Sequence, residues 1–390
     1  MTASSPAPAR LARRGFTLTE LMVGLLLTTI VVAALYNMFV TASYIFNVQS
    51  QASATQLRLR SAMEQVKDDV RRAGLMSTPN SDRDTTGVCP PPVPRVHAVV
   101  HGQGAGSDQA DLFQSYGNDL SPDTLILSGN FTSSAAYPGV LLDASRIVVQ
   151  LAPWTGPEAW EPSIYTQDGF ELAFRPDQYV RVSNAYGSAQ FAPLASVDGG
   201  QRSLELAAPL KFSSDGTCGL TGTGDYLEVN PVQHVLYRIE PRRRGEADMV
   251  ETDLVRSFWD PAGQVPVDGT DVVVGQNVVD FQVWFTVQDP ATPAAALPDD
   301  PDLSDEEGPE VAGVTLDGTA GARPDLVRVA AVRLCARGDR EDARWMFRPR
   351  AEGGPLLSVN LDGDQTMSAR VTCLTSEVEV VNLSLRNLQG

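Results

Sequence analysis

The stretch RRGFTLTELMVG, residues 13–24, decides how the N-terminal part of the chain is organised. It places two arginines and a glycine directly before a long apolar run, and one carboxylate, Glu20, near the head of that run. A carboxylate inside a transmembrane helix costs at least ~2.5 kcal/mol on insertion scales. The position of Glu20 therefore needs a chemical reason.

The apolar run after Glu20 is long enough to cross a membrane. No charged residue occurs from Leu21 to Leu57, and residues 21–45 are rich in Leu, Val, Ile, Met, Phe and Ala. A bilayer core needs about 20 such residues in a helix. Residues 16–45 are therefore predicted to form a transmembrane or assembly helix.

The charges on either side of the run predict its orientation. Arg10, Arg13 and Arg14 precede it, and the first positive charge after it is Arg58. The positive-inside bias then leaves the short N-terminus in the cytoplasm and exports the residues that follow the helix.

Two ordinary explanations of the apolar run leave Glu20 unexplained. Residues 52–54, Ala-Ser-Ala, have the form of a signal-peptidase site, but a signal peptide has an apolar region of only about 7 to 15 residues. A plain membrane anchor accounts for the length but gives no role to the carboxylate. An intramembrane carboxylate usually has a partner.

Residues Gly15 to Glu20, GFTLTE, resemble the type III signal of type IV prepilins and pseudopilins. That signal is a short basic leader ending in glycine, followed by phenylalanine and, as the fifth residue of the mature chain, glutamate. The resemblance implies that residues 1–15 are a leader, that prepilin peptidase cuts between Gly15 and Phe16, and that the new amine of Phe16 is methylated.

The same resemblance implies a partner for Glu20. In this family the glutamate pairs with the terminal amine of a neighbouring subunit during assembly. A buried carboxylate is tolerable in a low-dielectric layer mainly when an opposite charge compensates it. The glutamate is therefore expected to serve assembly.

The helix is predicted to continue beyond the membrane as an amphipathic segment, residues 46–75. Apolar residues recur there in steps of three and four, with one polar interruption, and charged residues occupy the opposite face. Gly74, followed by Pro79, supplies a stop. One helix from Phe16 to Ala73 is expected. The stripe consists of Ala52, Gln56, Leu59, Met63, Val66, Val70 and Ala73.

The remainder of the chain predicts a head of mostly antiparallel β-strands packed on the helix, an α+β, pilin-like fold. Clusters of Gly, Pro, Asp and Ser separate the strand-like segments, as turns require. Two regions are suggested, residues 76–230 and 231–390. The expected strands are 95–100, 123–129, 146–152, 170–174, 203–208, 225–230, 234–240, 278–287, 326–336 and 378–387.

Four segments of the head resemble the PilW family of minor pilins, most of all in the C-terminal region 231–390. They are DTLILSGN, HVLYRIEPRRRGEADMVETDLVRSFWD, NVVDFQVWFTVQD and RPDLVRVAAVRLCARG. The resemblance implies a low-abundance subunit that primes assembly at or near the pilus tip and supports adhesion or motility. Implied partners are other minor pilins, the major pilin and a tip adhesin of the PilY class.

Four cysteines lie beyond the membrane segment, in a region expected to be oxidising. Four cysteines permit three pairings, and pairing cannot be read from sequence. Cys335 with Cys373 is favoured because both lie in late strand-like segments, which leaves Cys89 with Cys218. Reduced core cysteines are the alternative.

No enzyme, metal site or cofactor site is expected. His97 and His101 have no cysteine nearby, so zinc spacing is lacking. The glycines of residues 101–109 precede no helix that could hold phosphate. The acidic turns at 299–308 and 360–366 do not fit an EF-hand loop, and solvated loops are expected there.

The charge balance bears on the remaining alternatives. The formal net charge is −18, and removal of the leader's three arginines makes the chain more negative still. Acidity of this size disfavours a DNA-uptake pilus subunit, and no nucleic-acid partner is expected. A type II secretion pseudopilin and a membrane-anchored periplasmic protein that keeps residues 1–15 stay open as alternatives.

Before assembly the chain is expected in the inner membrane, with its head in the periplasm, and afterwards at the pilus tip on the cell surface.

Overall fold

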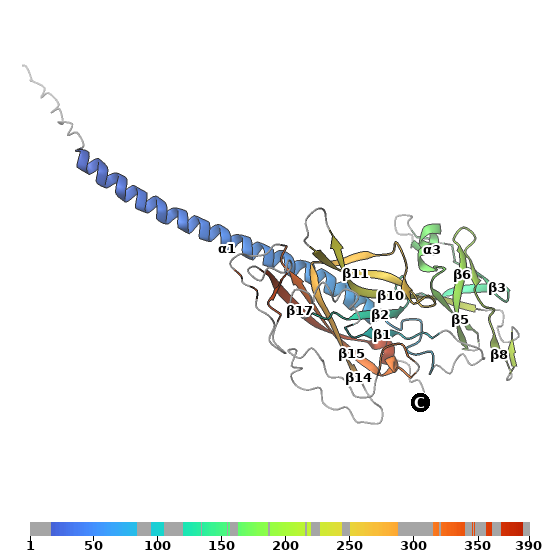
Figure 1. The fold of residues 1–390 in the computed structure, drawn as a ribbon. Helices are drawn as coiled ribbons and strands as arrows, with labels where there is room; N and C mark the ends of the chain where they lie inside the picture. The colour runs from blue at the N-terminus through green and yellow to red at the C-terminus, as the bar shows by residue number, and fades with distance from the viewer. Residues whose placement is uncertain are drawn as a thin grey trace, which may run out of the picture. The chain divides into compact units, whose positions relative to one another are not determined.

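The computed structural model combines one long helix with a large antiparallel β domain, which confirms the predicted α+β class (Figure 1). The chain divides into two compact units, Met1–Ala54 and Thr55–Gly390. The structure describes residues 17–83, 95–104, 120–133, 135–153, 155–156, 163–185, 188–214, 217–219, 227–243, 250–287, 315–319, 321–339, 345, 347, 356–360 and 368–384.

Helix α1 runs from Leu18 to Arg72, close to the expected bounds. Its end is set at Gly74, which has a φ of +76°, a conformation that glycine adopts most readily. A Cβ added at Gly74 would lie 2.8 Å from Leu383 Cδ2. The Gly74 N–H donates to Ser128 O at 2.8 Å, so the end of the helix is hydrogen-bonded to strand β2 (Thr124–Gly129).

The C-terminal part of α1 buries one face in the core of the β domain. The buried apolar positions are Leu59, Ala62, Met63, Val66 and Val70, and each lies three or four residues from another of them, which puts them on one helical stripe. The predicted stripe is confirmed from Leu59 onward, and it is wrong at Ala52 and Gln56, which are exposed. Burial starts at Thr55, where the second compact unit begins.

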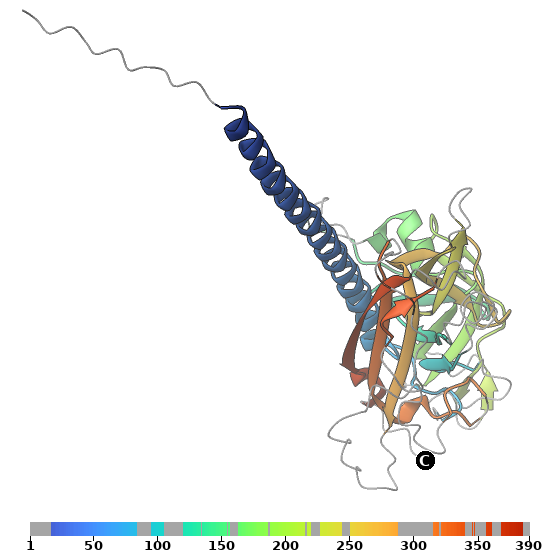
Figure 2. The ribbon, with the colours of Figure 1, turned by 60° about the vertical axis from the view of Figure 1, so that its left-hand side comes forward.

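Two sheets contribute side chains to this helix-bearing core. Figure 2 shows the strands of the β domain beside the C-terminal part of α1. Strand β10 (Leu227–Arg243) pairs through its C-terminal half with β2 (Thr124–Gly129) and β11 (Val250–Asp260). Strands β1 (Val99–Gly102), β12 (Val265–Pro266) and β13 (Val272–Gln276) extend that sheet. The second sheet has the order β14 (Val278–Val287), β15 (Val327–Arg337), β17 (Ala369–Glu379) and β16 (Ser358–Val359).

The N-terminal half of β10 belongs to a closed barrel. Going round the barrel, β10, β3, β4, β7, β6 and β5 pair in turn, and β5 returns to β10. Each of these six antiparallel strands has two partners, so the ring has no free edge. The other five strands are β3 (Tyr137–Asp143), β4 (Arg146–Val149), β5 (Tyr179–Asn184), β6 (Ala189–Asp198) and β7 (Ser203–Leu206).

The barrel is an insertion between two strands that pair with each other. Gly129, the last residue of β2, is the register partner of Gln233 in β10, and the chain between them builds the barrel. Strand β10 runs without interruption through residues 230 and 231, where the sequence suggested a change of region. Residues 227–230 and 234–240, from two separately expected strands, are therefore parts of one strand.

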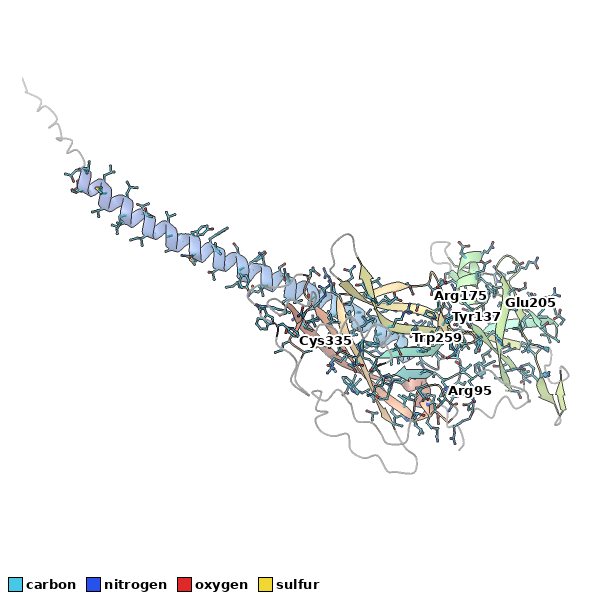
Figure 3. The ribbon with its side chains drawn as sticks, in the orientation of Figure 1. Arg95, Tyr137, Arg175, Glu205, Trp259 and Cys335 are labelled. Carbon is cyan, nitrogen blue, oxygen red and sulfur yellow. A yellow bond between two sulfur atoms is a disulfide. The ribbon has the colours of Figure 1, made fainter. Side chains whose placement is uncertain are left out.

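The barrel has its own apolar core, closed by helix α3 (Gln167–Ala173). Phe170 of α3 and Phe174 just after it are fully buried, and the ring of Tyr137, which Figure 3 labels, meets Phe174 edge to face with ring centroids 5.9 Å apart. Residues 170–174 were expected as a strand, which is wrong. The two phenylalanines are four residues apart, so a helix places both on one face, and Thr166 caps this helix through the Gly169 N–H.

Closure of the barrel depends on a glycine. Gly139 in β3 is paired with Leu227 of β10 on one side and with Val149 of β4 on the other. A Cβ there would lie 2.7 Å from Val229 Cγ2 and 3.1 Å from Ile147 Cγ2. Any larger residue would push apart two strands that face the same core.

The end of the chain also differs from expectation. Residues 378–387 were predicted as a strand, but β17 ends at Glu379, and helix α4 occupies Val381–Ser384. This short helix buries Leu383, whose side chain lies against the end of α1 at Gly74. The apolar residues Val381 and Leu383 therefore lie in a helical turn and not in a strand.

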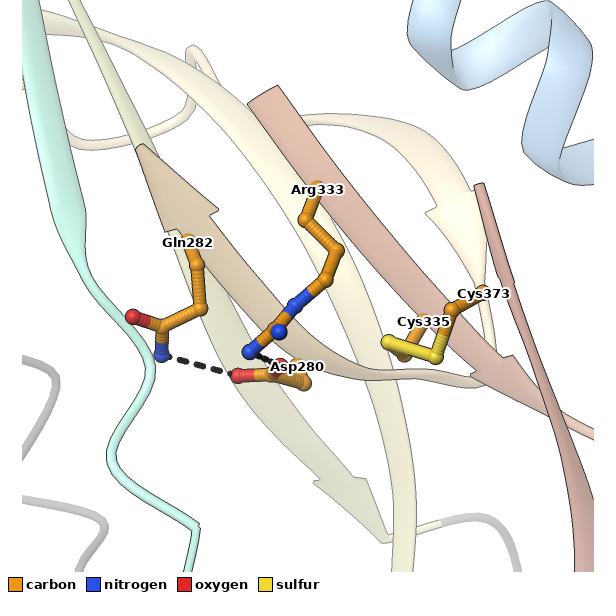
Figure 4. Close-up of a disulfide and its surroundings, with 5 residues drawn as sticks. All are labelled: Asp280, Gln282, Arg333, Cys335 and Cys373. Atoms are coloured by element: carbon orange, nitrogen blue, oxygen red, sulfur yellow. Dashed lines mark hydrogen bonds and ion pairs between the residues drawn. A yellow bond between two sulfur atoms is a disulfide. The ribbon is translucent and has the colours of Figure 1, made fainter. Parts of the chain in front are cut away.

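Cys335 of β15 and Cys373 of β17 form a disulfide, the pair that the sequence favoured. Asp280 of β14 is the register partner of Cys335, and it is almost fully buried. Arg333 pairs with Asp280 at 3.2 Å and Gln282 donates to it at 2.9 Å (Figure 4). The buried carboxylate is thus compensated, and three neighbouring strands are linked at one level.

Two buried glutamines join the barrel to the helix-bearing sheet. Gln178 accepts from the backbone N–H of His234 at 2.6 Å and donates to Trp259 O at 3.0 Å. Gln233 donates to Ala173 O at 3.2 Å and accepts from the Phe131 N–H at 3.1 Å. These side chains satisfy backbone groups where β10 passes from one sheet to the other.

We predict that the barrel can be removed without unfolding the remainder of the head. Replacing residues 131–232 with a single glycine gives an Asn130–Gly turn, which suits a two-residue hairpin between Gly129 and Gln233. The shortened chain should keep the Cys335–Cys373 disulfide and unfold cooperatively, as checked by mass spectrometry and thermal circular dichroism. Removal of residues 131–243, which deletes β10 entirely, is the matched control and should not fold. An aggregated or protease-sensitive shortened chain would contradict the prediction.

We predict that His234 lowers stability on the acid side. Burial lowers the pKa of this histidine to about 3, so the unfolded chain binds its proton more readily than the folded chain between pH 6.5 and 3. Stability then falls with decreasing pH by up to about 1.4 kcal/mol per unit in that window. His234→Gln should flatten the pH dependence of the unfolding free energy by that amount. Parallel curves for the two chains would refute it.

Candidate processing and assembly site

The candidate site is the start of α1 and the residues just before it. Gly15 and Phe16, between which the sequence predicts cleavage, lie outside the described residues. Description begins at Thr17, and Glu20 lies in the first turn of the helix. The structure therefore describes the surroundings of the carboxylate and not the bond to be cut.

Thr17 and Glu20 form a capping box at the start of α1. Glu20 Oε2 accepts from the Thr17 N–H at 2.9 Å and from the Thr17 hydroxyl at 2.8 Å. The Glu20 N–H lies 3.3 Å from Thr17 Oγ1 and donates to it. Reciprocal bonds of this kind satisfy N–H groups that a helix start otherwise leaves without partners.

The capping box is a feature that the sequence analysis missed. Its signal is present in the sequence as Thr, two residues and Glu directly before an apolar run. In the isolated chain Glu20 thus has a local partner before any neighbouring subunit is present. Pairing with a neighbour's amine, which the family resemblance implies, stays a prediction.

The rest of the described first unit suits an apolar environment. Among the described residues, α1 is the helix long and apolar enough to cross a membrane. Its large apolar side chains from Leu18 to Phe46 are exposed, apart from Tyr44, which is partly buried. Three hydroxyls in this stretch bond to carbonyls four residues earlier: Thr28 to Gly24, Thr29 to Leu25 and Thr41 to Asn37. Lipid would meet no unsatisfied hydroxyl at these positions.

The second unit holds its part of α1 through a buried polar cluster. Asp69 Oδ2 accepts from the Tyr237 hydroxyl and from Arg256 Nε, both at 2.6 Å. Burial and the charge of Asp69 raise the pKa of Tyr237 well above its usual value, so the hydroxyl keeps its proton and donates. This cluster fixes the rotation and the register of the helix on β10 and β11.

A second contact fixes the helix one turn after the start of the unit. Arg58 Nη1 donates to Asp339 at 2.6 Å, and Asn277 donates to the same oxygen at 2.8 Å. The hydrogen bond from Arg58 lowers the pKa of Asp339. Both side chains of the pair are well exposed, so it orients the helix more than it stabilises the fold.

The structure describes only some of the other candidate residues. Cys89 is outside the described residues, and Cys218 lies in β9 (Thr217–Gly219), paired with β8 (Phe212–Ser214), with its side chain not described. His97 lies 3.3 Å from Asp82, and His101 lies 3.0 Å from Asp123. Over the part of the chain that the structure describes, no three His, Cys, Asp or Glu side chains converge as metal ligands. The acidic segment at 299–308 and, except for Asn360, the segment at 360–366 fall outside that part.

Comparison with known families supports the N-terminal assignment. Residues 10–36 match the family model described as the prokaryotic N-terminal methylation motif. The match indicates a type IV pilin-like or pseudopilin protein that prepilin peptidase processes, with pilus-related partners, and it fits anchoring in the inner membrane before assembly. No curated protein and no solved structure matches the chain.

We predict that Thr17→Val frays the first turn of α1. The variant loses the hydroxyl that both donates to Glu20 and accepts from its N–H, and loss of an N-cap costs about 1 kcal/mol. Amide hydrogen exchange in the first turn should speed up by about fivefold in the detergent-solubilised full chain. Thr19→Val is the matched control, because among the described residues the Thr19 hydroxyl bonds only to that of Thr17, and Thr17→Ser should restore protection. Unchanged exchange in Thr17→Val would count against the capping box.

Proposed function

We propose that this chain is a minor pilin of a type IV pilus, resembling the PilW family, that primes assembly and resides at or near the pilus tip. The observation that carries the proposal is the methylation motif at residues 10–36, joined through one continuous helix to a large β head. The motif supports processing and assembly. The four PilW-like segments favour a minor pilin.

The size of the head supports a position at the tip. Besides the two sheets around α1, the head carries an inserted barrel with a separate core. A shaft subunit is surrounded by neighbours and gains nothing from such an insertion. At a tip fewer neighbours crowd the head, and other minor pilins, the major pilin and a PilY-class adhesin are the proposed partners.

The proposed route begins in the inner membrane with the N-terminus in the cytoplasm. Prepilin peptidase removes residues 1–15, and Phe16 receives the methyl group. Glu20 then pairs with the terminal amine of a neighbouring subunit as the chain enters the filament. The proposed role is structural, and no catalytic activity, cofactor or nucleic-acid partner is part of it.

A type II secretion pseudopilin is the second candidate, because the methylation motif is shared by both classes. Two measurements distinguish the possibilities. Mass spectrometry of the mature N-terminus tests processing, and an intact leader would overturn both the pilin and the pseudopilin assignment. Recovery of the chain in sheared surface filaments supports the pilus, whereas its absence from them, with an intact N-terminal methyl group, supports the secretion system.

We predict that Glu20→Gln leaves cleavage intact and lowers recruitment into filaments by at least about tenfold. Glutamine keeps the shape but removes the charge that would pair with an amine, and truncating one side of a buried charge pair typically costs 2 kcal/mol or more. Immunoblots of cell and sheared-filament fractions measure the ratio. Gly15→Val is the contrasting variant, which should accumulate uncut in the inner membrane. Normal filament incorporation of Glu20→Gln would refute the pairing role.

A further inference from the structure

The inserted barrel carries an open groove of about 540 Å³ on its surface. Three elements line it: the end of β4, the turn between β6 and β7, and the start of α3. A groove of this volume falls within the range of small-molecule sites. The lining residues are Val148, Val149, Gln150, Leu151, Tyr165, Gln167, Gly199, Gly200, Gln201 and Arg202.

The walls of the groove are held together by hydrogen bonds between the elements. The Val149 N–H donates to Arg202 O at 2.9 Å, which joins β4 to the turn. Glu171 of α3 accepts from the Gly199 N–H at 3.2 Å and from the Gln167 side chain at 3.1 Å. The turn and the helix are thus fixed to one carboxylate, and the groove is formed before any ligand arrives.

Arg202 supplies the positive charge of the groove. Its Nη2 donates to Tyr165 O at 3.4 Å, and its guanidinium carbon lies 5.9 Å from the centre of the Tyr165 ring. The residue lies in the turn with a φ of +53°, an uncommon conformation for an arginine. Among the described lining residues it is the one cation, on a chain with a formal net charge of −18.

The other polar side chains of the lining are those of three glutamines and Tyr165. Gln150, Gln167 and Gln201 have exposed side chains at the rim. An amide offers both donors and an acceptor, which is the combination that a sugar hydroxyl needs, because a hydroxyl also donates and accepts. An aromatic ring and a guanidinium beside them add a flat apolar surface and a fork of donors suited to a carboxylate.

We propose that this groove binds a carboxylated saccharide of one or two units, with Arg202 on the carboxylate and the glutamines on the hydroxyls. A polyanion such as nucleic acid does not fit, because one cation on an acidic chain cannot neutralise several phosphates.

The position of the barrel agrees with a binding role. It is inserted between paired strands, so the core around α1 forms from residues outside it. The proposal does not depend on where the chain sits in a filament.

Saturation-transfer NMR on the detergent-solubilised full chain, in a sugar-free detergent, tests the site. Methyl β-D-glucuronide is the probe, and methyl β-D-glucoside lacks only its carboxylate. We expect the glucuronide to bind at least about tenfold more tightly than the glucoside, in line with a charge-assisted pair. R202Q should weaken glucuronide binding by at least tenfold, whereas K211Q, an exposed charge on the barrel outside the groove, should leave it unchanged.

Three outcomes would overturn the proposal: no transfer to the glucuronide, equal binding of the two sugars, or full binding by R202Q. Thermal circular dichroism shows whether R202Q is folded. If it is not, Gln150→Ala, which removes an exposed rim amide, decides the matter. Weakened binding in that variant supports the groove, and unchanged binding rejects it.

Discussion

The head depends on burial of one face of the C-terminal part of α1. Leu59, Met63, Val66 and Val70 enter a core to which both sheets contribute, and without the helix the apolar faces of these sheets would have no cover. The Asp69 carboxylate makes this packing specific. It is buried with two donors, from Tyr237 and Arg256, so sliding or rotating the helix would leave a charge without partners, at a cost of several kcal/mol.

Strand β10 connects the core around α1 to the barrel. Its C-terminal half is held between β2 and β11, beside α1, and its N-terminal half completes the barrel between β3 and β5. The barrel is thus built on a strand that the helix-bearing core already fixes in place. The chain can carry a large insertion at the end of β2 because Gly129 and Gln233 remain neighbours whatever lies between them. Loop-closure entropy rises only slowly with the length of such an insertion.

The features predicted correctly from sequence are those with strong local signals. The apolar run and the stripe with steps of three and four predicted helix α1, and Gly74 predicted its end. The alternating apolar pattern predicted strands β2 and β14. Residues 170–174 failed because a short apolar run fits a strand or a helix equally well until its partners are known. Barrel closure could not be predicted, because it depends on non-local pairing at Gly139 and on a single strand serving two sheets. The capping box was predictable, since Thr17 and Glu20 carry its Thr-x-x-Glu pattern directly before the apolar run.

The capping box stabilises Glu20 too weakly to replace a charged partner. A cap is worth about 1 kcal/mol, whereas a carboxylate in a transmembrane helix costs at least ~2.5 kcal/mol. Thr17 therefore offsets part of the cost, enough to shape the helix start but not enough to neutralise the charge. Under the proposed function the missing part comes from an amine that cleavage before Phe16 creates. Both Thr17 donors approach the same oxygen, Glu20 Oε2, which leaves Oε1 on the other side of the carboxylate as the natural acceptor for that amine. Capping and assembly would then act on different oxygens of one side chain and need not exclude each other.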